Sequence, residues 1–237
     1  MGDAVNASEP LEGVIKFDAR HVERELTSRE FGALACQITA WRAILARTGL
    51  VGQDPTRYDG AGYGNVSGRF GAPSNPTGRR SFLVTGTQTG GAECIDLDDY
   101  AAVHTYDIQR NRVESSGLIQ PSSEAMTHGA IYDLSSTVRF VFHGHCPVIW
   151  QRSRDLRIPT TDRDIPYGTP EMAREVGRLY RDGTLAEKRI LAMGGHEDGV
   201  IVFGPTPNEA GAVLISALAD AYALVCAEQG GGLCPID

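Results

Sequence analysis

Two histidines separated by a single residue stand near the end of an apolar run, in the segment VRFVFHGHCP. Alternate side chains of a β-strand point to the same face, so His143 and His145 are predicted to share a face, and Gly144 lets a ligand or another backbone approach closely. Two imidazoles on one face suit a borderline metal such as zinc, manganese or cobalt. Taken alone, the pair is explained more simply by two hydrogen-bonded histidines at a strand end.

A catalytic metal site needs a third protein ligand and an open coordination position. His196, in MGGHEDGVIVFG, is the best candidate, because it lies in a glycine-rich turn between two predicted strands and can reach across from there. His128 follows Glu124 by one helical turn and is expected to support that helix or the glutamate. His21 and His104 stand among charged residues and are expected to be solvated.

A possible anion site precedes Glu124, in the segment PSSEAMTHGAIY. Ser122 and Ser123 are predicted to begin a helix, where free backbone N–H groups and the positive end of the helix dipole favour an anion. Simple N-capping by serine is the alternative interpretation, and both can apply to the same residues.

The elements that must position these residues follow from hydrophobic period and helix boundary signals. Capping signals at Thr27, Thr169 and Thr206 open three of four predicted helices. These helices cover residues 27–49, 121–134, 169–183 and 206–229, and the predicted strands cover 81–85, 138–145, 189–193 and 199–204. No repeat or long linker interrupts them, so a single domain with helices packed on a sheet is expected over residues 25–237, after a flexible arm at 1–24.

Composition limits the function further. The chain has 237 residues and a net charge of −8, which argues against a general nucleic-acid surface. No apolar stretch long enough to span a membrane and no secretory signal is seen, so a cytoplasmic enzyme without a membrane partner is expected. The cysteines are odd in number and form no C-x-x-C pair, so reduced and mostly buried thiols are expected at Cys36, Cys94, Cys146, Cys226 and Cys234.

Four segments, GNVSGR, PSSEAMTHGAIY, VFHGHCP and GHEDGVIVFG, occur in this order and together resemble the class II aldolase and adducin family over roughly residues 31–226. The resemblance implies an α/β fold with a central, largely antiparallel sheet flanked by helices in three αβα layers. It also implies that His143, His145 and His196 hold a divalent metal, with zinc preferred over manganese or cobalt.

The same resemblance implies roles for other residues. Glu124 becomes the acid/base, and Asn65, Ser122 and Ser123 become a site for a substrate phosphate. Where this chain has VTGTQTGG, the family has a shorter T-P-S-G turn that contributes to phosphate binding. Thr87 is the best match to the threonine of that turn, and Thr89 and Gly90 are alternative matches to the turn. A second departure is that Glu197 and Asp198 separate His196 from Gly199, where family members have glycine directly after the histidine.

The function implied is reversible aldol cleavage of a sugar phosphate or a similar hydroxylated small molecule, through a metal-stabilised enediolate. Glu124 moves the proton, with a pKa that partial burial is expected to raise. Tyr167, in IPYGTPEM, matches a family tyrosine that acts on the aldehyde oxygen, often across a subunit interface of a homotetramer. A packed loop tyrosine is the alternative for Tyr167.

Two groups of alternatives remain open. The same chemistry in the family supports epimerisation of pentulose phosphates and dehydration of a methylthio-sugar phosphate, which fold and metal do not separate. A non-catalytic, adducin-like interaction module belongs to a different class. The retained Glu124 and three histidines favour the enzyme.

Overall fold

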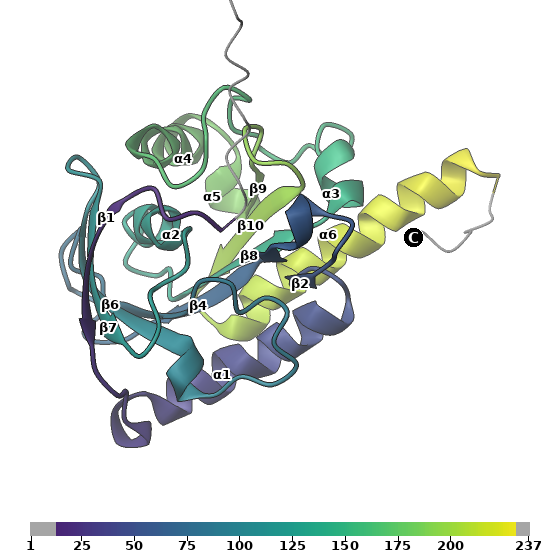
Figure 1. The fold of residues 1–237 in the computed structure, drawn as a ribbon. Coiled ribbons are helices and arrows are strands. Elements are labelled where there is room, and N and C mark those ends of the chain that lie inside the picture. Colours follow the sequence, from purple (N-terminus) through teal and green to yellow (C-terminus); the bar gives the residue numbers. More distant parts are fainter. Residues whose placement is uncertain (1–12, 231–237) are drawn as a thin grey trace, which may run out of the picture.

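A computed structural model describes residues 13–230. They form three layers, with an eight-stranded sheet between two layers of helices (Figure 1). The strand order is β1-β7-β6-β5-β4-β8-β10-β9, and neighbours are antiparallel except for the parallel edge pair β1–β7. The strands are β1 (Asp18–Glu23), β4 (Asn65–Arg69), β5 (Phe82–Thr85), β6 (Tyr100–Asp107), β7 (Arg112–Gly117), β8 (Phe140–His145), β9 (Ile190–Ala192) and β10 (Gly199–Gly204). A separate ribbon joins β2 (Gly52–Gln53) to β3 (Gly62–Tyr63).

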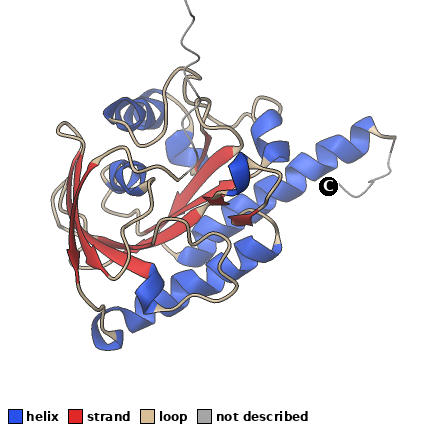
Figure 2. Ribbon diagram, in the orientation of Figure 1, coloured by secondary structure: helices blue, strands red, loops and turns tan. Residues whose placement is uncertain are grey.

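Helices cover both faces of the sheet, as Figure 2 shows. Each face has its own apolar core. One face packs against α1 (Ser28–Arg47), α3 (Pro147–Gln151) and α6 (Pro207–Glu228), and the other against α2 (Ala125–Tyr132), α4 (Pro170–Asp182) and α5 (Leu185–Lys188). The prediction of one α/β domain with a largely antiparallel central sheet between helical layers is therefore confirmed.

Strand alternation decides which layer receives the polar side chains. On β8, Phe142 joins the core under α1 and α6, whereas Val141 joins the core under α2 and α4. His143 and His145 have the same parity as Val141, so they face the α2 layer. Asn65 of β4 also faces the α2 layer, because its neighbour Val66 points to the opposite face and belongs to the α1 core.

The helix boundaries follow the sequence signals in most cases. Thr169 and Thr206 cap α4 and α6, accepting hydrogen bonds from Met172 N at 3.3 Å and Glu209 N at 3.1 Å. Thr27 also precedes α1, but its side chain makes no capping hydrogen bond, so the capping predicted at Thr27 is not formed.

The helix predicted from residue 121 begins later. Ser122 and Ser123 lie before α2, whose N-cap is Glu124. The serines were predicted to begin this helix, but the extended backbone that pairs with the end of β5 delays its start, since Ser122 N donates to Thr85 O at 3.2 Å. They therefore lie next to the end of β5.

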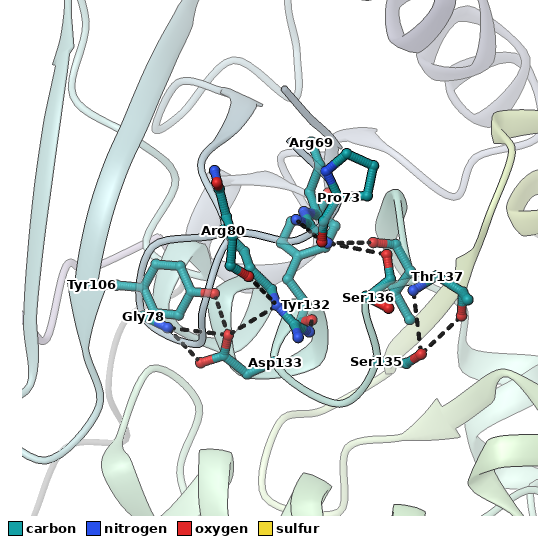
Figure 3. A network of polar contacts seen from close by, with 12 residues as sticks. Arg69, Pro73, Gly78, Arg80, Tyr106, Tyr132, Asp133, Ser135, Ser136 and Thr137 are labelled. Carbon is teal, nitrogen blue, oxygen red and sulfur yellow. Dashed lines mark hydrogen bonds and ion pairs between the residues drawn. The ribbon is translucent and has the colours of Figure 1, made fainter. Parts of the chain in front are cut away.

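A polar network holds the far end of α2 (Figure 3). Asp133, which follows α2, accepts hydrogen bonds from Tyr106 Oη at 2.7 Å and from Gly78 N at 3.0 Å, and Arg80 Nε lies 4.0 Å from the same carboxylate. Arg80 also donates to the Tyr132 carbonyl. Because the loop before β5 and strand β6 are both tied to this end, α2 is fixed at the end opposite Glu124.

The sequence mispredicted the N-terminal segment and missed two strands. The flexible arm was predicted for residues 1–24, but β1 pairs in parallel with β7, so the chain is already ordered at Asp18. Residues 1–12 lie outside the described part. β6 and β7 were not predicted as strands, although together they continue the sheet from β5 to β1.

The cysteine prediction is partly wrong. The described cysteines are unpaired, as expected, but Cys36 and Cys94 are exposed and Cys226 is half-buried, so only Cys146 of these four is buried. Cys36 lies on α1 and Cys94 on the turn before Leu97, and both side chains face solvent, whereas their neighbours Ala35 and Ile95 belong to or pack against the core. Cys234 lies outside the described residues.

Helix α6 is the one helix among residues 13–230 that is long and apolar enough to cross a membrane by length and composition. In the fold it packs on the sheet, with Ala210, Leu214 and Leu218 buried in the α1 core. Core helices of globular proteins have the same composition. Only 28% of its apolar window is buried, so packing on the sheet accounts for one stripe of the helix and leaves apolar surface exposed.

Candidate active site

The three predicted metal ligands converge. His143 and His145 project from the end of β8, and His196 reaches them from the turn between β9 and β10. One nitrogen from each ring can be chosen so that all lie within 4.8 Å of one another, and the three side chains are buried. His143 Nε2 and His145 Nε2 face each other at 3.1 Å. Two nitrogens on one tetrahedral zinc lie about 3.3 Å apart, so this spacing fits a metal.

The surroundings of His143 also fit a metal ligand. Its Nδ1 lies 3.1 Å from the Val200 carbonyl and donates to it. That bond places the proton on Nδ1 and leaves the Nε2 lone pair directed toward the other histidines. With a metal bound, the three imidazoles would be neutral nitrogen donors, which is a donor set that suits zinc.

Glu124 lies beside the histidine cluster, as predicted. Its Oε1 is 3.2 Å from His196 Nδ1, and its Oε2 has no hydrogen-bond partner in the described part of the chain, although the side chain is only 1% exposed. A buried carboxylate oxygen without a donor is unusual and is explained if a bound cation or substrate group faces it.

The protonation of Glu124 differs from the prediction. Burial does act to raise the pKa of this carboxyl, but the hydrogen bond and charge of His196, together with the charge of His143, outweigh it and hold the pKa below its ordinary value. The expectation of a raised pKa is therefore wrong, because it considered burial without the neighbouring imidazoles.

Tyr167 belongs to the same site within one chain. Its ring centroid lies 4.4 Å from that of His196, and the side chain is only 3% exposed. A parallel bridge between Pro166 and Gly195 brings the two segments together. The Tyr167 hydroxyl donates to the Val14 carbonyl at 3.5 Å. Tyr167 is thus a packed tyrosine that also borders the histidines.

The predicted phosphate residues lie on neighbouring segments. Asn65 is paired in register with His143 on the adjacent strand, and its Oδ1 is buried with no partner among residues 13–230. Ser122 and Ser123 are both buried just before Glu124. Thr87 N donates to Gln120 O at 3.0 Å, which joins the altered turn to the serine segment. Asn65, Thr87 and the two serines thus surround the end of β5.

The altered turn after β5 is held by an arginine that sequence reasoning missed. Arg42 of α1 is buried, and its Nη2 donates to the carbonyls of Thr89, Gly90 and Ala92 at 2.8, 3.0 and 2.7 Å. Thr89 Oγ1 is turned inward to the Gly86 carbonyl at 2.9 Å. Thr89 and Gly90 therefore brace the turn, whereas Thr87 stays next to the serines.

A second missed group lies beside His145. Tyr58 packs edge-on against His145 with ring centroids 4.7 Å apart, and its hydroxyl donates to Asp198 Oδ2 at 2.6 Å. Arg57 Nη2 donates to the same hydroxyl at 2.5 Å and lies 3.5 Å from Asp198. The extra residue Asp198 thus binds the loop before β3. No local pattern signals this pairing, since the partners are 140 positions apart.

The other histidines are structural. His128 Nδ1 lies 2.6 Å from Ser67 Oγ, so this buried residue supports β4 and not Glu124. His21 and His104 were expected to be solvated, but both are half-buried and hydrogen-bonded, to Ser115 and Ser116 respectively. The serines of β7 provide these partners, which the charged sequence context concealed.

A model of the class II aldolase and adducin N-terminal domain matches residues 54–221, which include all three histidines and Glu124. The chain belongs to the class II aldolase and adducin family. No match was found among curated proteins. Membership of the family confirms the resemblance and supports a metal-dependent, aldolase-type function.

Solved structures share the class II aldolase fold at low identity. L-fuculose-1-phosphate aldolase from Thermus thermophilus is 19% identical, with 86% of this chain and 99% of that chain covered and a TM-score of 0.58. A sugar-phosphate aldolase from Thermotoga maritima is 16% identical, with 83% and 95% covered and a TM-score of 0.59. YgbL from Escherichia coli, a putative aldolase/epimerase/decarboxylase, is 17% identical, with 86% and 92% covered and a TM-score of 0.58.

Proposed function

We propose that this chain is a metal-dependent carbon–carbon lyase that catalyses reversible aldol cleavage of a sugar phosphate or a similar hydroxylated substrate. The observation that carries the proposal is the buried Glu124 carboxylate, 3.2 Å from His196 and beside the cluster of His143, His145 and His196. Zinc is the preferred ion, and manganese or cobalt suits the same donors.

The bound ion would supply a Lewis acid that polarises a hydroxyl and a carbonyl oxygen of a ketose. In the condensation direction, Glu124 takes a proton from the carbon next to the ketone, and that carbon forms the new bond with an aldehyde carbon. Tyr167 gives a proton to the aldehyde oxygen, which becomes a hydroxyl. A proton then passes through solvent from Glu124 to Tyr167 and restores both. Cleavage is the reverse.

The protonation state of Glu124 suits this role. The lowered pKa keeps the carboxylate ionised at neutral pH, which is the form that can accept a proton. Tyr167 must release its bond to the Val14 carbonyl before its hydroxyl serves the substrate, and that bond is long, at 3.5 Å. A small movement of the chain near Val14 is therefore part of the proposal.

Asn65, Thr87, Ser122 and Ser123 are proposed to bind the substrate phosphate. They provide amide and hydroxyl donors next to Glu124, and the aldolases of similar fold from Thermus thermophilus and Thermotoga maritima act on sugar phosphates by their names. We also propose a cytoplasmic homotetramer, in which the partly exposed apolar face of α6 helps to form an interface.

The experiment is a metal measurement joined to an activity screen. Metal per chain is determined by mass spectrometry on tag-free protein for the parent, His143→Ala, His196→Ala and Glu124→Gln. We expect one divalent ion in the parent and in Glu124→Gln, and loss of the ion in both histidine variants. A panel of ketose phosphates is then screened for released aldehyde with a coupled reductase. Glu124→Gln should lose about a hundredfold or more in kcat.

Two results would change the proposal. A parent that binds no metal even after reconstitution removes the Lewis acid and favours a non-catalytic, adducin-like module. Metal binding with isomerised or dehydrated products, but no released aldehyde, assigns the site to epimerisation or dehydration.

A further inference from the structure

A short segment before β1 lies across the candidate site. Residues 13–17, here called the strap, are held at several points. Gly13 O accepts from Thr87 Oγ1 at 3.3 Å, and Val14 O accepts from the Tyr167 hydroxyl at 3.5 Å. Lys16 O accepts from Asn111 Nδ2 at 2.8 Å. The strap therefore contacts both a predicted phosphate residue and the predicted acid.

The buried side chain of Phe17 and the backbone of Gly13 keep the strap in place. Phe17 is buried in the same apolar core as Tyr167. Gly13 has a φ of +74°, which other residues rarely adopt, and a Cβ atom at this position would lie 1.9 Å from Nε2 of Gln88, so the Gln88 side chain lies directly against Gly13. Gln88 is one of the extra residues of the altered turn, and its Oε1 accepts from Gly62 N at 2.9 Å. The strap therefore packs directly against the altered turn.

Lys16 brings a positive charge to this site. Its Nζ lies 3.4 Å from the centre of the Tyr167 ring and is shielded from solvent. Its stem passes close to the serine segment, because a Cβ placed on Gly168 would lie 3.7 Å from Lys16 Cβ and 3.2 Å from the Ser123 carbonyl. The ammonium group therefore lies on the Tyr167 ring, and the stem of Lys16 lies near the backbone of Ser123.

The predicted phosphate residues need such a charge. Asn65, Thr87, Ser122 and Ser123 are all neutral, and a phosphate that leaves water is costly to bind unless a cation accompanies it. The ammonium group of Lys16, over the Tyr167 ring, can supply that charge. The only other lysine in the chain, Lys188, donates to the Leu156 carbonyl, in a segment that contains none of these residues.

We infer that Lys16, carried by the strap, binds the anionic group of the substrate and so selects phosphorylated over uncharged substrates. The inference rests on the proposed function, because it assigns a binding residue to the same site. Lys16 would bind the phosphate oxygens by charge, while Ser122, Ser123 and Asn65 orient them by hydrogen bonds.

Inorganic phosphate is the probe, measured by titration calorimetry on the full chain, both metal-loaded and metal-free. Lys16→Gln and Lys16→Met should raise the Kd for phosphate about tenfold to a hundredfold, as expected for loss of a charged hydrogen bond. Lys16→Arg keeps the positive charge and should weaken phosphate binding less than Lys16→Gln does. Lys188→Gln is the matched control and should not change the Kd.

Several results would overturn the inference. The first is that Lys16→Gln and Lys16→Met bind phosphate with the same Kd as the parent. The second is that phosphate binding depends on the metal but not on Lys16. The third is that the parent binds no phosphate. Metal content tests the proposed function separately. If the parent binds phosphate through Lys16 but binds no metal, the proposed lyase function is refuted and the anion site stands. If the parent binds metal but its phosphate affinity does not depend on Lys16, the anion site is refuted and the proposed function stands.

Discussion

Tyr58 donates a 2.6 Å hydrogen bond to the Asp198 carboxylate, and the same tyrosine ring packs edge-on against His145. Asp198 lies two residues after His196, and its carbonyl accepts from Cys146 N at 2.8 Å. One side chain therefore connects the turn that carries His196 to the strand that carries His145. This contact makes Tyr58 a positioning residue for two of the three proposed ligands.

Tyr58→Phe keeps the ring against His145 and removes only the hydroxyl. A hydrogen bond to a buried charged group is lost, so the free energy of unfolding should fall by about 2 kcal/mol. Metal affinity should fall about tenfold, since a group that holds the ligands in place is loosened. Urea unfolding and metal competition with a chelating dye measure the two effects.

Tyr180→Phe is the control for this variant, because no hydrogen bond is found for the Tyr180 hydroxyl among the described residues, and it should change neither quantity. If Tyr58→Phe lost stability but kept the parent's metal affinity, Tyr58 would serve the fold and not the site.

The sequence predicted the site better than the residues that support it. His143 and His145 share a face because strand alternation is a local rule, and Glu124 and His196 stand in recognisable segments. Tyr58 and Asp198 carry no such signal, because each becomes informative only when the fold brings it to a partner far away in the chain. The same holds for Lys16, whose neighbours Tyr167 and Ser123 come from other elements.

The missed strands have a related explanation. β7 reads RVESSG, which is polar, yet Ser115 and Ser116 are buried because they bond to His21 and His104. A hydrophobicity pattern cannot distinguish such serines from those of a loop. The predicted arm failed for the same reason, since β1 is fixed by its pairing with β7 and not by its own apolar residues.

Metal binding should stabilise the folded chain. An ion that binds only the native state adds about 2.7 kcal/mol when its concentration is about a hundred times Kd. For a domain of this size, the midpoint of thermal unfolding should rise by about 5–10 °C when zinc is added to chelator-treated parent. His196→Ala should show no rise, and His21→Ala, which changes a histidine outside the site, should respond like the parent. An equal response of all three proteins would place the stabilising ion elsewhere.

Arg42 should be essential for the altered turn. Arg42→Lys keeps a charge but cannot supply the same planar donors to the carbonyls of Thr89, Gly90 and Ala92, so unfolding should become easier by about 1–3 kcal/mol. Arg47→Lys, an exposed change on the same helix, should stay within about 0.5 kcal/mol of the parent. Amide hydrogen exchange gives the local readout, and unchanged protection around residues 89–92 in Arg42→Lys would contradict the bracing role.

His128 should make the fold sensitive to acid. Burial, together with the nearby charge of His143, lowers the pKa of this imidazole to about 3, although the charge of Glu124 opposes the shift. The unfolded chain has an ordinary pKa of about 6.5, so between the two values the unfolded state binds a proton that the folded state does not. The stabilising contribution is complete above about pH 6.5 and is lost by up to about 1.4 kcal/mol per pH unit as the pH falls.

His128→Gln keeps a polar partner for Ser67 but does not titrate. We expect the parent to lose about 2 kcal/mol more than this variant between about pH 7 and pH 5, measured by urea unfolding of the metal-free proteins. The two proteins differ only at residue 128, so the difference between the two curves isolates His128. Between pH 7 and pH 8 the curves should run parallel, because His128 is neutral in both states there. Parallel curves down to pH 5 would mean that His128 takes up its proton in the folded protein, which its burial against Phe82 and its bond to Ser67 should prevent.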